Sequence, residues 1–252
     1  MTTGRPRRIS CYGVDGCKAG WFYFRLGSED DYDFGVVDAL DTLLERISRR
    51  SPVFVDMPVG LLESGAPDRG CDSIARRLLK GRASSVFPAP LRPVLECNDY
   101  AEANARQRAL SGHGLSRQAF GILPKIREVD RLMRRHPDAA RQVYESHPEI
   151  GFQAIAGAPL AHSKREQAGF EERLALLGSV WPAAESAVAR AYLWTARRDV
   201  ARDDILDALV LALTARLGSR RWVTIPQPPC LDAYGLPMRM VYGRFSGARD
   251  HF

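Results

Sequence analysis

The feature that most constrains this 252-residue sequence is a change of hydrophobic period near its N-terminus. Three short apolar runs, Ile9–Val14, Trp21–Leu26 and Tyr32–Val37, are separated by tight polar turns, a pattern typical of an antiparallel meander. From Asp38 onward the apolar residues follow helical spacing. Pro52–Pro58 is then a nearly continuous apolar run, as in a strand buried on both faces of a mixed sheet. The segment therefore predicts an α/β fold.

The remainder of the chain predicts helices around one or two more strands. A helical, Arg-rich region interrupted by Gly and Pro covers about residues 60–140. In chain order the later elements are a strand at Gln142–Pro148, helices at Arg165–Leu177 and Ala183–Arg198, a helix from Asp203 to Leu217, and a strand at Met238–Phe245. The helix from Asp203 to Leu217 is apolar on nearly every side, so we expect it to be buried.

The composition is that of a globular protein with a basic surplus. Hydrophobic residues make up 45% and charged residues 26%, which excludes a mainly disordered, collagenous or disulfide-dense chain. The net charge of +6 favours a polyanionic partner such as nucleic acid. It fits a compositional bias towards arginine equally well, because only four of the 36 basic residues are lysines.

The cysteines and the apolar runs indicate a cytoplasmic protein. Five cysteines without a C-x-x-C pair cannot all pair within one chain, so reduced thiols are expected. Asp15 and Lys18 interrupt the first apolar stretch, which therefore lacks the core of a secretory signal. No uncharged apolar run is long enough to span a bilayer, so no membrane partner is expected.

Acidic residues recur at the places where a sheet would bring them together. Asp15 and Asp56 stand at strand ends, Glu145 lies in a third strand, and Asp204 and Asp207 share one face of the late helix. Parallel strands deliver their carboxyl ends to one edge of a sheet, so all five are candidates for one cluster. Carboxylates are the ligands that Mg²⁺ and Mn²⁺ prefer, and two such ions roughly 4 Å apart can hydrolyse a phosphodiester. The predicted cofactor is Mg²⁺ or Mn²⁺.

Each acidic residue also has a simpler interpretation. Asp15 and Gly16 form a common turn dipeptide, and Asp204 is placed to cap a helix. Asp207 is harder to explain in this way, because it lies beyond the first helical residues among apolar neighbours. Asp56 follows three apolar strand residues and is similar in this respect. The joint pattern favours a shared metal site.

Five phrases in order resemble a known family. They are GVDGCKAGW, VDMPVGL, GRASSVFPAP, ESHPE and DDILDAL, and they span roughly Tyr12 to Ala215. An aspartate in a first strand before a hairpin, another after a fourth strand and a late Asp-x-x-Asp helix resemble the RNase H-like fold. The late helix is similar to that of resolvases of the RuvC kind. Together the phrases resemble domain-of-unknown-function family 429, described as predicted RNase H-like nucleases.

The resemblance implies a domain plan and a set of ligands. It implies an RNase H-like domain at residues 9–225, with a mixed five-stranded central sheet, flanking helices and a helical insertion at about 60–140. Residues 226–252 would form a C-terminal extension packed on the same domain. Asp15 and Asp56 match the strand ligands, and Asp204 and Asp207 match the late-helix pair. Glu145 has no single counterpart in the simplest nucleases of this fold, so its role as ligand or base is inferred from its position alone.

Other residues are candidates to contact the substrate. Lys18 and Lys125 stand out in a chain dominated by arginine, and each could place a compact ammonium at a phosphate or a carboxylate. Arg82 and Ser84 follow a predicted helix end at Gly81 and could cradle a phosphate, although a capped turn explains them equally well. His147 could orient or deprotonate a water, while lone histidines commonly have structural roles.

The sequence therefore predicts a divalent-metal-dependent nuclease acting on DNA or RNA, in which Asp15, Asp56, Glu145, Asp204 and Asp207 hold the metal. A branched substrate would favour a homodimer. Two alternatives stay open. The residues from Asp15 to Lys18 also resemble the first phosphate-binding hairpin of sugar-kinase or actin-like nucleotide binders. The chain could equally be a non-catalytic nucleic-acid or nucleotide-binding module that keeps its carboxylates for stability.

Overall fold

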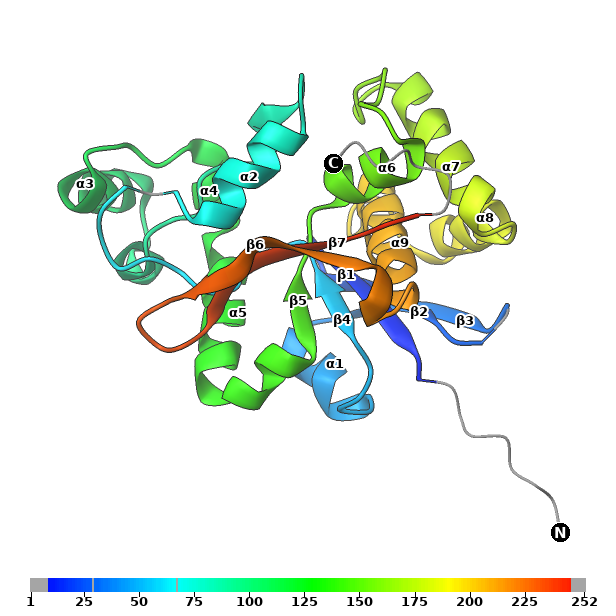
Figure 1. The fold of residues 1–252 in the computed structure, drawn as a ribbon, viewed down its shortest axis with the longest axis horizontal. Coiled ribbons are helices and arrows are strands. Elements are labelled where there is room, and N and C mark those ends of the chain that lie inside the picture. The colour runs from blue at the N-terminus through cyan, green and yellow to red at the C-terminus, as the bar shows by residue number, and fades with distance from the viewer. Residues whose placement is uncertain (1–8, 29, 67, 246–252) are drawn as a thin grey trace, which may run out of the picture.

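The computed structural model describes residues 9–28, 30–66 and 68–245, so the last seven residues of the expected C-terminal extension lie outside it. The described chain forms an α/β fold around a central sheet (Figure 1). The sheet strands are β1 (Cys11–Cys17), β2 (Gly20–Leu26), β3 (Tyr32–Val37), β4 (Val53–Val55) and β5 (Val143–Glu145).

The order of the strands confirms the expected mixed five-stranded sheet. It runs β3-β2-β1-β4-β5, with β2 antiparallel to both β1 and β3, and β4 parallel to both β1 and β5. Val14 of β1, Val55 of β4 and Glu145 of β5 stand side by side across the three parallel strands. The carboxyl ends of these strands therefore meet at one edge of the sheet.

Helices cover both faces of the sheet. They are α1 (Leu40–Arg46), α2 (Gly70–Leu78), α3 (Tyr100–Ser111), α4 (Arg117–Gly121), α5 (Leu123–Arg135), α6 (Pro148–Ala156), α7 (Gln167–Val180), α8 (Ala184–Trp194) and α9 (Arg202–Arg216). On one face, Val14 and Val55 pack with residues of α1 and α5. On the other face, Phe22 and Phe54 pack with α9 and with residues of α7 and α8. Alternate strand residues thus enter two separate cores.

Gly13 brings α9 into close contact with β1. A β-carbon at this position would lie 2.1 Å from the carbonyl oxygen of Ala208 and 2.1 Å from the amide nitrogen of Ala212. Only a glycine permits so close an approach of two backbones. The contact sets the position of Asp207, which directly precedes Ala208.

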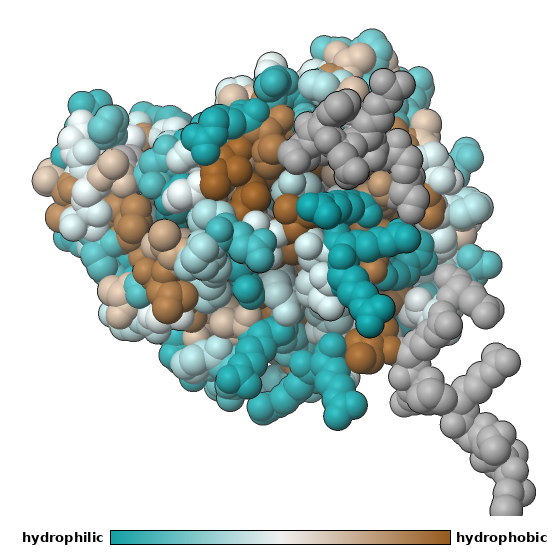
Figure 2. All heavy atoms as spheres, in the orientation of Figure 1, coloured by the Kyte–Doolittle hydropathy of each residue, from teal (hydrophilic) through white to brown (hydrophobic). Residues whose placement is uncertain are grey.

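The segment between β4 and β5 is largely helical, as expected for residues 60–140. It contains α2, α3, α4 and α5, of which α2, α3 and α4 gather on one side of the molecule while α6, α7 and α8 lie on the other (Figure 1). In Figure 2, brown hydrophobic side chains gather beside α2, where Ile74 and Leu78 are only partly buried. The insertion therefore forms one wall of the molecule.

A two-stranded hairpin near the C-terminus joins the two sides. Its strands are β6 (Trp222–Leu231) and β7 (Pro237–Gly243), and its residues Ile225 and Met240 pack against α2 and α6. The domain boundary expected at residue 225 lies inside β6. The sequence did not predict β6, because Pro226, Pro228 and Pro229 obscure it. The register shifts between Ile225 and Cys230, which accommodates these prolines.

Two further observations bear on the expected setting of the protein. None of the helices in residues 9–28, 30–66 and 68–245 is long and apolar enough to cross a membrane. The five cysteines all carry free thiols, as the sequence predicts.

Candidate functional site

Three aspartates meet where β1 and β4 end against α9. Asp15 lies near the end of β1, and Asp56 directly follows β4, where its amide donates to the carbonyl of Val14 over 3.1 Å. Asp207 lies in the second turn of α9. Asp15 and Asp207 are buried, with 9% and 3% of their surface exposed, whereas Asp56 is partly exposed. This is the convergence that the sequence predicts for these residues.

The electrostatics of these aspartates are those of a shared site. Burial raises the pKa of Asp15 well above its ordinary value, and the charges of Asp56 and Asp207 raise it further. Burial raises the pKa of Asp207 to about 7, with Lys164 lowering it and Asp56 raising it. Each carboxylate therefore experiences the charge of another, and the group favours a bound cation.

Lys164 supplies a positive charge to this group. It lies between α6 and α7, and its Nζ is 3.1 Å from Asp207 Oδ2 and 3.3 Å from Asp203 Oδ2. Asp207 Oδ1 is buried and finds no hydrogen-bond partner among the described residues. One oxygen of Asp207 is thus paired with an ammonium, while the other is left to accept a ligand.

Asp204 stands at the border of the site. Its Oδ2 accepts a hydrogen bond of 2.8 Å from the amide of Ala201, so it caps the first turn of α9. Burial raises its pKa to about 6, and its own charge contributes to the raised pKa of Asp15. Its carboxylate is therefore close enough to influence the cluster while it also performs the capping role that the sequence allows.

Glu145 does not join the aspartates, which corrects the expectation that it shares their metal. It pairs with Val55 across the parallel strands, so it faces the core that contains Val55, whereas Asp56 faces the opposite side. Its carboxylate accepts hydrogen bonds from both terminal nitrogens of Arg69, at 2.6 and 2.8 Å, and from the amide of Val59 at 2.8 Å. Glu145 is a structural partner of a buried arginine.

The geometry around Glu145 includes a compact set of ligand atoms. Cys71, Asp72 and Glu145 offer one ligand atom each within 4.8 Å of one another, and no other three described residues do so. Arg69 already supplies a positive charge to this set, since it also binds Asp72 over 2.6 Å. A cation here would have to displace a buried guanidinium, so we do not place the metal there. The ligand atoms of Asp15, Asp56 and Asp207 do not all lie within 4.8 Å of one another.

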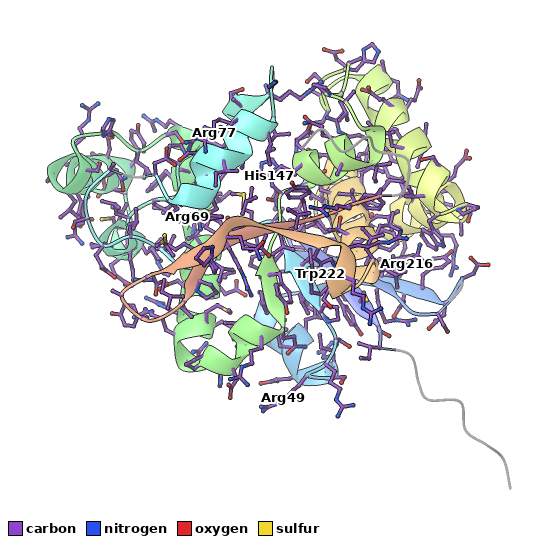
Figure 3. All side chains as sticks on the ribbon, viewed as in Figure 1. Arg49, Arg69, Arg77, His147, Arg216 and Trp222 are labelled. Atoms are coloured by element: carbon purple, nitrogen blue, oxygen red, sulfur yellow. The ribbon has the colours of Figure 1, made fainter. Side chains whose placement is uncertain are left out.

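A cavity of about 720 Å³ opens beside the aspartates, between the insertion and the start of α6. Its lining includes Asp15, Asp56 and Asp207 together with the expected contact residues Arg82, Ser84, Lys125 and His147. Glu145 reaches its wall as well. Arg69 and His147, which Figure 3 labels at the start of α2 and of α6, both line it. The volume is in the range of sites for small molecules or short segments of larger ones.

The expected contact residues have different surroundings. Arg82 donates to the carbonyl oxygens of Leu160 and His162, so it holds the segment that precedes Lys164. The Nζ of Lys125 donates to the carbonyl of Gly20 over 2.6 Å. Both side chains line the cavity, but their charged groups already have partners.

Lys18 is the one expected contact residue that the structure places elsewhere. It lies exposed in the turn between β1 and β2 and is not part of the cavity lining among the described residues. This corrects its predicted role in the site, because the turn carries it past the end of β1 and away from Asp15.

Sequence reasoning assigned no role in the site to several charged residues of the cavity, among them Lys164 and Glu149. Lys164 is one of only four lysines, so the same rarity that singled out Lys18 and Lys125 could have identified it. Glu149 belongs to the phrase ESHPE and lies one helical residue inside α6. Both line the cavity next to the aspartates, so the wall contains more charge than the sequence reasoning assigned to it.

The comparisons with known proteins give one match. No curated protein and no solved structure matches the chain. A family model does match residues 13–229, which run from within β1 through most of β6 and so include Asp15, Asp56 and Asp207. The chain belongs to the family described as protein of unknown function (DUF429).

Proposed function

We propose that this protein is a divalent-metal-dependent nuclease that hydrolyses phosphodiester bonds. The observation that carries the proposal is the group of Asp15, Asp56 and Asp207 on a cavity wall, where one buried oxygen of Asp207 has no hydrogen-bond partner in the described part of the chain. A buried, unpaired carboxylate oxygen next to two further carboxylates fits the ligand chemistry of Mg²⁺ or Mn²⁺. Asp204 would support this group from the first turn of α9.

An RNase H-like fold is part of the proposal. The sheet order β3-β2-β1-β4-β5 supports it, because an antiparallel meander of three strands continues into two parallel strands. The positions of the acidic residues support it as well, since they fall near the end of the first strand, after the fourth strand and on the helix that crosses the sheet. These are the positions that the sequence resemblance implies.

The side chains around the cavity have separate tasks in this proposal. Asp15, Asp56 and Asp207 would hold the metal, which supplies an activated water and stabilises negative charge on the phosphate oxygens. Lys164 and Arg165 line the same cavity and would attract the phosphate backbone. His147 lines the same cavity and has a buried Nδ1 without a hydrogen-bond partner among the described residues. The substrate would be a nucleic acid, DNA or RNA.

A non-catalytic binding module is the second candidate. One observation favours it, because the ammonium of Lys164 already pairs with Asp207 and so partly neutralises the cluster without a metal. In that case the cavity would bind a nucleotide or a strand of nucleic acid, and the carboxylates would position Lys164. The two candidates differ in turnover.

A cleavage assay tests the proposal. Labelled single-stranded, duplex, hybrid and branched nucleic acids are incubated with the wild type in Mn²⁺, in Mg²⁺ and in EDTA. Asp56→Asn and Asp207→Asn are compared with Asp203→Asn, a control from the same end of α9. We expect cleavage that needs the metal, is lost in the first two variants and persists in the control. Cleavage at the wild-type rate by folded Asp56→Asn or Asp207→Asn would refute the proposal, and binding without turnover would favour the module.

A further inference from the structure

The junction between β5 and α6 gathers buried polar atoms that lack partners. Ser146 Oγ, His147 Nδ1 and Glu149 Oε2 are all buried and have no hydrogen-bond partner among the described residues. All three residues line the cavity beside the aspartates. Buried polar atoms are normally paired, so a group of them on one cavity wall indicates a missing ligand.

The free oxygen of Glu149 is held in place by a buried arginine. Glu149 is 6% exposed, and its Oε1 accepts a hydrogen bond of 2.6 Å from Arg173, which is 1% exposed. Arg173 is itself fixed by a 2.9 Å bond from its Nη1 to the carbonyl of Gly169. Glu149 is therefore held at the cavity wall through Oε1, while Oε2 keeps no hydrogen-bond partner among the described residues.

His147 has the arrangement of a metal-binding histidine. Its Nε2 lies 3.3 Å from the carbonyl oxygen of Ser85, which can only accept a hydrogen bond. The proton of a neutral imidazole therefore belongs on Nε2, which leaves the lone pair on the unpartnered Nδ1. Histidines that bind metals commonly donate their second nitrogen to a backbone carbonyl in this way.

Asp56 lies between this junction and the other two aspartates of the cluster, Asp15 and Asp207. The amide of Ser146 donates to the carbonyl of Val55 over 3.0 Å, so the chain runs directly beside Asp56 before α6 begins. No described group donates a hydrogen bond to the Asp56 carboxylate, and the residue is partly exposed. Its side chain can therefore turn towards either group.

We propose that His147 and Glu149 form a second divalent-cation position, which shares Asp56 with the position at Asp15 and Asp207. The inference deepens the proposed function and rests on it for its catalytic meaning. An imidazole nitrogen among carboxylate oxygens binds Mn²⁺ better than Mg²⁺, so the new position selects a transition metal. The negative charge of Glu149 excludes an anion there. Arg173 acts as a positioning residue, because its link to this position is the bond to Glu149.

Mn²⁺ binding without any substrate tests the inference. Titration of the full chain followed by calorimetry should show two Mn²⁺ ions per wild-type chain. Glu149→Gln and His147→Gln should each weaken one of the two positions at least tenfold, while Glu185→Gln, an exposed site on α8, leaves both unchanged. Electron spin echo spectra of the Mn²⁺ form should show coupling to an imidazole nitrogen in the wild type. That coupling should be lost in His147→Gln and retained in His113→Gln.

The outcomes separate the two proposals. A stoichiometry of one in the wild type, or nitrogen coupling that persists in His147→Gln, would overturn the second position even if the protein cleaves nucleic acid. Two Mn²⁺ ions with the expected losses would support it even if no nucleic acid is cleaved, and the proposed function would then be the part that fails. If Glu149→Gln does not fold, His147→Gln alone decides, since Gln retains an acceptor and a donor at the start of α6.

Discussion

Neutralising Asp207 should stabilise the metal-free protein at high pH. Asp207 is 3% exposed, and burial raises its pKa from 3.8 to about 7 in the folded chain. The folded state therefore holds a proton on this carboxyl over a pH range in which the unfolded chain has lost it. Below pH 3.8 the burial of Asp207 costs no free energy of unfolding, because the carboxyl is protonated in both states. The free energy of unfolding falls as the pH rises through about 7, so at pH 8 the wild type carries the full cost of burying the carboxylate.

The size of the effect follows from the same values. A pKa change of one corresponds to about 1.4 kcal/mol, so the penalty at pH 8 is at most about 4 kcal/mol. The attraction of Lys164, whose side chain is 42% exposed, already lowers this pKa and is therefore included in the figure. We therefore expect Asp207→Asn to be more stable than the wild type by up to about 4 kcal/mol at pH 8, with little difference at pH 4.

Urea denaturation in EDTA at the two pH values measures this difference. Asp203→Asn is the matched control, because Asp203 faces the same ammonium at 3.3 Å but is 40% exposed, and its effect should stay within about 0.5 kcal/mol. Mn²⁺ at a hundred times its Kd should then stabilise the wild type by about 2.7 kcal/mol and the variant far less. An Asp207→Asn protein less stable than the wild type in EDTA at pH 8 would show that the Lys164 pair outweighs burial, which would refute the reasoning.

Three further predictions concern the surroundings of the site. Gly13→Ala should destabilise the fold by at least about 3 kcal/mol in urea denaturation, because the added carbon meets the backbone of α9 at 2.1 Å. The control Gly178→Ala has nothing within 4 Å of the added carbon and should stabilise the fold by about 0.5 kcal/mol. Equal effects of the two substitutions would contradict the close approach of β1 and α9. Glu145→Ala should destabilise the fold by about 3 kcal/mol, since it removes a partner of buried Arg69, but should leave Mn²⁺ affinity in calorimetry unchanged. A tenfold loss of Mn²⁺ affinity in the folded variant would show that Glu145 is a metal ligand. Lys164→Met should tighten Mn²⁺ binding about tenfold, because the ammonium competes for Asp207; an unchanged Kd would show that it does not compete.

Local pattern was enough to predict the strands and one part of the site. The apolar run before Asp56 and the alternation in the meander follow from the two-residue period of a buried strand, so the mixed sheet could be predicted. Asp207 was identified because a carboxylate among apolar helical residues needs a partner. These inferences need only neighbours in the sequence.

The register of neighbouring strands could not be predicted from the local sequence pattern. Glu145 stands at the end of a strand like Asp15 and Asp56, but its pairing with Val55 turns it to the opposite face. A shift of one residue exchanges the two faces of a strand, and the pattern of a strand as short as β5 does not reveal which face is which. The position of Glu145 could therefore not be predicted.

By itself, the sequence determined the strands of the central sheet, most of the helices and the carboxylates at their ends, because these depend on short-range period and burial. Only the tertiary structure decided which charges meet. It places Lys164 against Asp207, 43 residues away in the sequence, and it pairs Glu145 with Arg69, 76 residues away in the sequence. Electrostatic interactions depend on distance in space, and folding sets that distance through the packing of backbones such as β1 against α9.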